Sequence, residues 1–154
     1  MKPKTLGLIV NPIAGLGGTV GLKGSDGWYI QRRARKFGAK PRCQERTVEA
    51  LQRLQPLKND LLILTYPGEM GADAALTSGF QVRCLGSIRP GETTAEDTRT
   101  AARKILHGQA NLLLFAGGDG TARDICQAVA DQLPVLGLPP GVKMHSAAFA
   151  PHPI

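Results

Sequence analysis

The chain has 154 residues, enough for one domain and too few for two ordinary ones. Hydrophobic residues make up 42% and aromatic residues 5%, which predicts a mainly aliphatic core. The formal net charge is +7, and residues 1–58 hold 12 of the 19 Lys and Arg residues but only 3 of the 12 Asp and Glu residues. A basic first half favours nucleotide or polyphosphate ligands. Nucleic acid ranks second, because few aromatic side chains are present to stack on bases and no nucleic-acid-binding motif occurs.

The cysteines and the N-terminus exclude other classes of protein. Cys43, Cys84 and Cys126 are far apart and lack CxxC or Cys/His spacing, which disfavours a metal site or a disulfide. We expect all three to be buried, reduced thiols. The N-terminus has only a short apolar run, so neither a signal peptide nor a membrane span is predicted. We therefore expect a cytoplasmic protein.

The first part of the chain combines a short strand with a long glycine-rich loop. Residues 5–10 are apolar and predict a strand that ends at Asn11-Pro12. Residues 13–27 are unusually long for a simple connection, so ligand contact is favoured over a flexible linker. Asp26 is a predicted N-cap for a helix over 28–37, whose many basic residues form either a polyphosphate patch or a solvated face.

The middle of the chain alternates helices and strands. Apolar residues every third position predict a helix over 48–57, capped by Thr47. A buried strand is predicted at 61–65 and an alternating strand at 80–85. Between these strands, Glu69 and Asp73 either contact a ligand at the strand end or complement the dipole of a helix's first turn, and the two interpretations are equally supported.

Overlapping capping boxes at residues 93–97 predict a helix that continues to His107. Its buried stripe is formed by Thr98, Ala101, Ala102, Ile105 and Leu106. Thr94, Glu96 and Asp97 lie where they could face a ligand, but capping explains them without one. His107 is explained as a residue at the C-terminal end of the helix.

A continuous apolar run at 112–116 predicts a strand buried on both faces, and a glycine-dense turn follows it directly. Glycines allow close approach of the backbone, and the amides at a helix start favour phosphate. Asp119 in this turn suggests a metal ion, a ribose hydroxyl or a proton to be removed. A helix is predicted over 122–132, with Arg123 either binding phosphate or pairing with Asp124 or Asp119.

The last predicted elements are a strand over 134–138 and a short helix through Phe149. The repeated alternation of strands and helices predicts an α/β fold, a three-layer α/β/α arrangement around a mainly parallel sheet.

Three stretches together resemble a known family: Asn11 to Gly18, Gly117 to Ile125 and Leu138 to Ala150. They resemble the NAD kinase and diacylglycerol kinase superfamily, and within it the ATP-NAD kinase-like branch that includes the acetoin-catabolism protein X group. The resemblance implies the N-terminal, Rossmann-like and phosphofructokinase-like domain of these kinases over residues 1–154, with the family's second, β-rich domain absent. It also implies phosphoryl transfer from ATP or polyphosphate to a hydroxyl of NAD, with Mg²⁺.

By the same resemblance, Asp119 is the general base or the acceptor ligand. The implied nucleotide-binding residues are Asn11, Gly15, Gly17, Gly18, Gly117, Gly118, Gly120, Thr121, Arg123 and Lys143. We expect nucleotides as ligands, no nucleic acid, no membrane and assembly into a homo-oligomer. No metal-ligating residues are predicted.

Where related kinases have a GTxND-like pattern, this chain has Lys143, His145 and Ser146. Lys143 could neutralise donor phosphates, and His145 or Ser146 could contact a ribose; exposed loop positions are the alternative. This departure supports a second hypothesis, a noncatalytic nucleotide-binding regulatory module. A third is a relative that phosphorylates another hydroxyl, such as that of a lipid.

Overall fold

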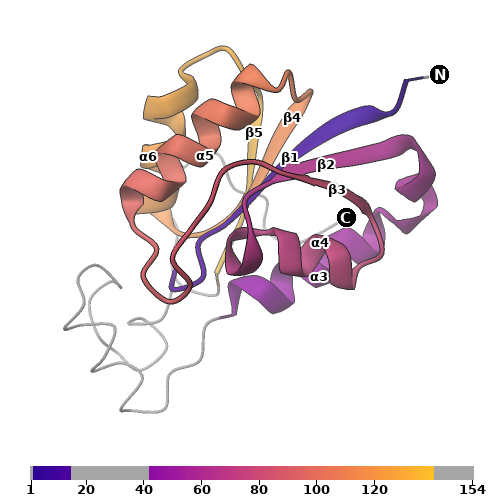
Figure 1. Ribbon diagram of the computed structural model, residues 1–154, viewed down its shortest axis with the longest axis horizontal. Coiled ribbons are helices and arrows are strands. Elements are labelled where there is room, and N and C mark those ends of the chain that lie inside the picture. The colour runs from indigo at the N-terminus through magenta and orange to yellow at the C-terminus, as the bar shows by residue number, and fades with distance from the viewer. Residues whose placement is uncertain (1, 15–41, 141–154) are drawn as a thin grey trace.

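The computed structural model describes residues 2–14 and 42–140. They form one sheet of five parallel strands in the order β3-β2-β1-β4-β5. The strands are β1 (Lys4–Val10), β2 (Leu61–Thr65), β3 (Gln81–Cys84), β4 (Leu112–Ala116) and β5 (Val135–Leu138). Helices cover both faces (Figure 1), which confirms the predicted α/β fold with a parallel sheet.

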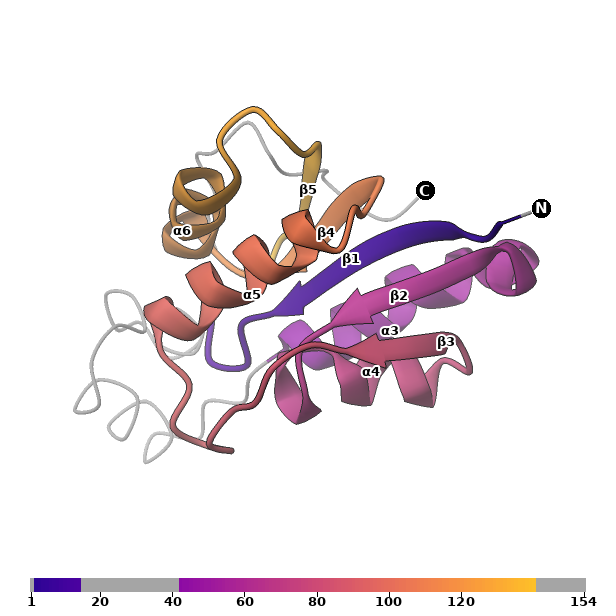
Figure 2. The ribbon, with the colours of Figure 1, turned by 45° about the horizontal axis from the view of Figure 1, so that its top comes forward.

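Among the residues that the structure describes, two helices lie on each face of the sheet. One face carries α3 (Cys43–Arg53) and α4 (Ala72–Thr77), and the other carries α5 (Ala95–His107) and α6 (Asp119–Val129). Figure 2 shows the two pairs on opposite sides of the twisted strands. Short 3-10 turns over Gln55–Asp60 and Gly68–Met70 flank β2. None of the helices that the structure describes is long and apolar enough to cross a membrane.

The core consists of two aliphatic layers, because side chains alternate between the two faces along each strand. On the α3 and α4 side, Leu8, Ile63 and Leu114 belong to one buried cluster. On the α5 and α6 side, Ile9 and Phe115 belong to the other. The central strands β1 and β4 are buried on both faces, as their continuous apolar sequences predict.

The predicted strands are all present: those at 61–65 and 112–116 have the predicted ends, and the other three differ by one residue at one or both ends. The helix predicted over 48–57 is wrong at both ends, because α3 begins at Cys43 and ends at Arg53. Thr47 is therefore not a cap. It lies inside the helix, where its hydroxyl donates to the carbonyl of Cys43 at 2.6 Å. This local bond satisfies a polar group that faces the sheet.

The helix α5 confirms the capping box and the predicted end at His107. The hydroxyl of Thr94 accepts from the amide of Asp97, and the carboxylate of Asp97 accepts from the amide of Thr94 at 2.9 Å. The buried stripe is also confirmed, with Thr98, Ala101, Ala102 and Ile105 buried and Leu106 half-buried. The predicted helix over 28–37 and the short helix through Phe149 lie outside the described residues.

The expectation of three buried thiols is wrong for two of them. Cys43 is buried, whereas Cys84 and Cys126 are exposed. Cys84 ends the edge strand β3, and Cys126 lies on the outer side of α6, next to the buried Ile125. The preference of cysteine for burial is a general tendency, and position in the fold overrides it here.

Candidate functional site

The strand order creates a topological switch point between β1 and β4. From β1 the chain goes on to β2 on one side, and β4 lies on the other side. In open α/β sheets, ligands bind outside the carboxyl ends of the strands at such a point. Here these positions hold the turn Asn11–Ala14 after β1 and Gly117-Gly118 after β4. The two motifs predicted to bind nucleotide therefore meet at the place where the fold favours a ligand.

Asn11 connects both sides of this switch point. Its amide donates to the carbonyl of Ala116 at 2.8 Å, which extends the pairing of β1 with β4 by one residue. Its side-chain oxygen accepts from the amide of Ile13 at 3.2 Å. Its side-chain nitrogen donates to the hydroxyl of Thr121 at 2.9 Å. One asparagine thus fixes the turn after β1 and holds it against the first turn of α6.

Gly117 is required by packing. A Cβ atom at this position would lie 2.5 to 2.7 Å from the Oγ1, Cβ and Cγ2 atoms of Thr121. Thr121 is only 4% exposed, so its side chain has little room to move away. The amide of Gly117 also donates to the carbonyl of Leu138 in β5, at 3.4 Å. This glycine brings the end of β4 close to α6.

The start of α6 has the features of an anion-binding helix terminus. Gly118 is the N-cap residue, with extended backbone angles and no side chain to accept from the first-turn amides. The first helical hydrogen bond runs from the amide of Ala122 to the carbonyl of Gly118, at 3.0 Å. Amides at such a start, together with the helix dipole, attract phosphate. Gly120 is exposed, and a Cβ there would meet no atom within 4 Å.

The predicted helix over 122–132 is wrong at both ends, because α6 begins at Asp119 and ends at Val129. Asp119 and Thr121 therefore lie in the first helical turn and not in a loop before it. Asp119 is half-buried, on the turn that follows Gly118. Thr121 was expected to cap the helix or contact phosphate, but its buried hydroxyl accepts from Asn11. Its position makes it a supporting residue for the glycine turn.

Arg123 is exposed on α6, one turn beyond the glycines. The alternative in which it pairs with Asp124 is wrong, because the carboxylate of Asp124 accepts from Arg99 of α5 at 2.8 Å. Arg123 therefore has an exposed charge near the start of α6. The predicted residues Gly15, Gly17, Gly18 and Lys143, together with His145 and Ser146, lie outside the described residues.

The connection between β3 and α5 lies at the same carboxyl edge and is held there by Glu69. Its carboxylate accepts from the amide of Gly91 at 2.6 Å. Asp73 is exposed in the first turn of α4, as its alternative role at a helix dipole predicts. Glu69 lies in the first turn of a 3-10 helix, as one of its two predicted roles requires, whereas its bond to the loop at Gly91 was not predicted. The sequence signal for a role at this edge was a carboxylate shortly after the end of a strand.

Tyr66 packs beneath that connection, at the end of β2. It is 3% exposed, and its ring and hydroxyl occupy the space where Gly86 would carry a Cβ. Burial, and then the charge of Asp97, raise the pKa of the Tyr66 hydroxyl. The side chain is consequently a neutral phenol at pH 7. It supports the connection after β3 by packing and brings no charge to this edge of the sheet.

The sequence profile of the ATP-NAD kinase N-terminal domain family matches residues 6–154. The chain belongs to this family. The match includes both sides of the β1–β4 switch point and supports a kinase-like function in which a nucleotide is phosphorylated. The family implies ATP and NAD as substrates. A search among curated proteins finds no match.

Proposed function

We propose that the chain is an NAD kinase-like phosphotransferase domain, which transfers a phosphoryl group from ATP or inorganic polyphosphate to a hydroxyl of NAD. The observation that carries the proposal is the strand–GGDGT–helix unit at the switch point, joined to the turn after β1 by the bond from Asn11 to Thr121. Phosphoryl transfer depends mainly on positioning and charge stabilisation. A rigid glycine turn beside helix amides is suited to both.

In this mechanism the first-turn amides of α6 bind phosphate oxygens, and the open space at Gly120 admits them. Asp119 orients the acceptor hydroxyl and removes its proton, so that the hydroxyl oxygen can attack the transferred phosphorus. The bond from this phosphorus to the bridging oxygen of the donor breaks, and ADP or the shortened polyphosphate leaves. Arg123, exposed nearby on α6, stabilises negative charge on the donor. Asn11 acts through Thr121 and holds this turn in place.

Mg²⁺ fits the same residues. Within residues 2–14 and 42–140, no group of three His, Cys, Asp or Glu side chains could hold a metal ion. Magnesium often uses one or two carboxylates plus substrate phosphates. The donor phosphates would hold it here, beside the first turn of α6, and bound Mg²⁺ would neutralise their charge.

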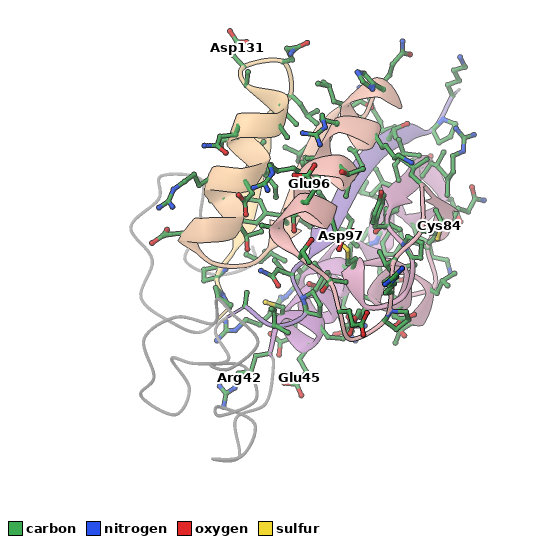
Figure 3. The ribbon with its side chains drawn as sticks, turned by 60° about the vertical axis from the view of Figure 1, so that its left-hand side comes forward. Arg42, Glu45, Cys84, Glu96, Asp97 and Asp131 are labelled. Atoms are coloured by element: carbon green, nitrogen blue, oxygen red, sulfur yellow. The ribbon has the colours of Figure 1, made fainter. Side chains whose placement is uncertain are left out.

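The test is NADP formation from NAD with ATP and magnesium, or with polyphosphate, by wild type and Asp119→Asn. Loss of a general base lowers turnover by about 10²- to 10⁴-fold. Asp131→Asn is the matched control, because Asp131 lies just beyond the other end of α6 (Figure 3) and is exposed. Melting temperatures of both variants establish folding. Equal turnover by wild type and folded Asp119→Asn would remove Asp119 from the mechanism.

A noncatalytic nucleotide-binding module is the second candidate, favoured by the segment with Lys143, His145 and Ser146 in place of a GTxND-like pattern. Binding of NAD or ATP is expected to raise the melting temperature of the protein under either candidate function. Product in excess of enzyme is expected only for the kinase. Stabilisation by NAD or ATP without multiple turnover would favour the module.

A further inference from the structure

Arg46 on α3 carries a buried polar group without a partner. The helix packs Cys43, Thr47, Ala50 and Leu51 against the sheet. Arg46 lies at the border of this buried face and is half-buried. Its Nε atom is buried and has no hydrogen-bond partner. Native proteins leave few such groups unsatisfied, and each one requires an explanation such as a bound ion.

No described side chain supplies a counterion to Arg46. Glu45 and Glu49, on the same helix, are exposed and form no ion pair with it. Within residues 2–14 and 42–140, the ion pairs belong to Arg99 and Arg103 and lie on α5 and α6. A buried Nε–H group without a partner opposes folding, because its desolvation is not offset by a hydrogen bond.

Cys43, a titratable neighbour of Arg46 on the same helix, carries no negative charge. Burial raises the pKa of the Cys43 thiol to about 12, although the charge of Arg46 lowers it. At pH 7 the thiol is therefore protonated and neutral. Asp73, on the adjacent helix α4, is exposed to solvent. The charge of Arg46 must be balanced by water or by an anion from outside the described residues.

The surroundings of Arg46 place it beside the switch point. The thiol of Cys43 lies 3.8 Å from the carbonyl of Ala14, within the turn that follows β1. The helix α3 also contacts β1, β4 and β5. In Figure 3, Arg42 and Glu45 mark the first turn of α3 at the end of the molecule opposite Asp131, which follows α6. The helices α3 and α6 thus begin at the same edge, on opposite faces of the sheet.

We propose that Arg46 binds a phosphate oxyanion of the phosphate donor, on the α3 side of the β1–β4 switch point. The planar guanidinium presents paired N–H donors that match phosphate, and charge-assisted bonds of this kind are strong. The first turn of α6 would approach the ligand from the other face. The identification of the anion as the donor rests on the proposed function.

The proposal is tested by calorimetric titration with inorganic tripolyphosphate. Wild type is compared with Arg46→Met, Arg46→Lys and the control Arg53→Met, which removes an exposed arginine from the last turn of the same helix. Arg46→Met should weaken binding tenfold or more. Arg46→Lys should weaken it less, because the charge remains and the paired donors are lost. Arg53→Met should bind as wild type does.

The melting temperature without ligand separates binding from a structural role. If Arg46 serves a ligand, Arg46→Met removes an unpaired charge, and the variant should melt at the same temperature as wild type or higher. A lower melting temperature with unchanged tripolyphosphate affinity would overturn the proposal. If Arg46→Met does not fold, the melting temperature and the tripolyphosphate affinity of Arg46→Lys are compared with those of wild type instead. Absence of tripolyphosphate binding by wild type would also overturn it.

Titrations with ATP and with NAD separate donor from acceptor. Arg46→Met is expected to bind ATP and tripolyphosphate more weakly than wild type does. Weaker binding of NAD alone would contradict the assignment of the anion as the phosphate donor. The proposed function is tested apart from this by NADP formation. Arg46-dependent tripolyphosphate binding without NADP formation would support the phosphate site and remove the NAD kinase activity. NADP formation together with unchanged tripolyphosphate binding by Arg46→Met would support the NAD kinase activity and overturn the phosphate site at Arg46.

Discussion

The side-chain amide of Asn11 donates to the hydroxyl of Thr121 at 2.9 Å and thereby joins residues 110 positions apart in the sequence. The bond connects the end of β1 with the first turn of α6. Since Thr121 is buried, its hydroxyl has no ready substitute for this donor. The geometry of the glycine turn therefore depends on a residue from the opposite end of the described chain.

Asn11→Ala should lower the free energy of unfolding by about 1–3 kcal/mol, the usual cost of leaving a buried acceptor unsatisfied. Urea denaturation measures this difference. Asn59→Ala is the control, because Asn59 is exposed in a 3-10 turn far from the site, and it should change stability little. Equal stability of Asn11→Ala and wild type would show that water replaces the bond without cost.

The sequence was sufficient to predict the strands of the sheet and to propose a candidate site. Strand β4 could be predicted because its apolar run has the length and continuity of a strand buried on both faces. The site could be located because a glycine turn follows that strand. The partner of Asn11 could not be predicted, since a contact over 110 positions is set by the strand order and not by local pattern.

Two helix starts were predicted too late, for related physical reasons. At α6, the glycine at position 120 suggested a continuing turn, but the extended backbone of Gly118 already permits the helix to begin at Asp119. At α3, Thr47 resembled a cap, whereas its hydroxyl bonds to the carbonyl of Cys43 within the helix. Threonine makes either bond, and tertiary packing decides between them.

Gly117 and Gly120, which come before and after Asp119 in the glycine turn, should respond differently to alanine. Gly117→Ala should destabilise the fold by about 1–3 kcal/mol, since its Cβ would collide with the side chain of Thr121. Gly120→Ala should leave stability equal or raise it by up to about 1 kcal/mol, because the position is open and helical. Urea denaturation of both variants makes the comparison.

Ligand binding also tests the difference between Gly117→Ala and Gly120→Ala. If phosphate approaches α6 at Gly120, Gly120→Ala should bind tripolyphosphate more weakly than wild type while remaining folded. A stable Gly120→Ala with unchanged affinity would place the phosphate elsewhere. A Gly117→Ala protein as stable as wild type would mean that α6 moves away from β4 without cost.

Glu96 should make stability dependent on pH in the acidic range. Hydrogen bonds from Arg99 and Arg103 lower the pKa of its carboxyl below the ordinary value of 4.5. A depressed folded-state pKa stabilises the protein above the unfolded value, and this contribution is lost as the pH falls through the folded value. Wild type should therefore exceed Glu96→Gln in stability at pH 7, and the difference should shrink below about pH 4.5.

Urea denaturation at several pH values measures that difference. Glu92→Gln is the control, because Glu92 is exposed and precedes the helix that carries the ion pairs. A constant difference between wild type and Glu96→Gln from pH 7 to pH 3 would contradict the role of the arginines.

The three thiols should react at very different rates. Cys84 and Cys126 are exposed and should be alkylated by iodoacetamide in the native protein at pH 8. Cys43 is fully buried and should react only after unfolding in urea. Mass spectrometry of peptides from native and unfolded samples distinguishes the sites. Rapid native labelling of Cys43 would show that α3 opens from the turn after β1.

Cys43 should also make the fold sensitive to alkali. Burial raises the pKa of this thiol from 9.0 to about 12, so the folded state keeps a proton that the unfolded state loses above pH 9.0. A raised folded-state pKa contributes stability that is complete below the unfolded value and is lost as the pH rises. Between pH 9.0 and about 12, this loss is about 1.4 kcal/mol per pH unit.

The comparison that isolates this effect is wild type against Cys43→Ala, in urea denaturation at pH 7.5 to 11. Cys43→Ala lacks the thiol, so its stability should fall less steeply with pH, and the two proteins should converge. Tyr66, whose pKa is also raised by burial, contributes the same slope to both proteins and cancels. Parallel curves would mean that the Cys43 thiolate is accommodated without unfolding, with Arg46 as the neighbouring positive charge.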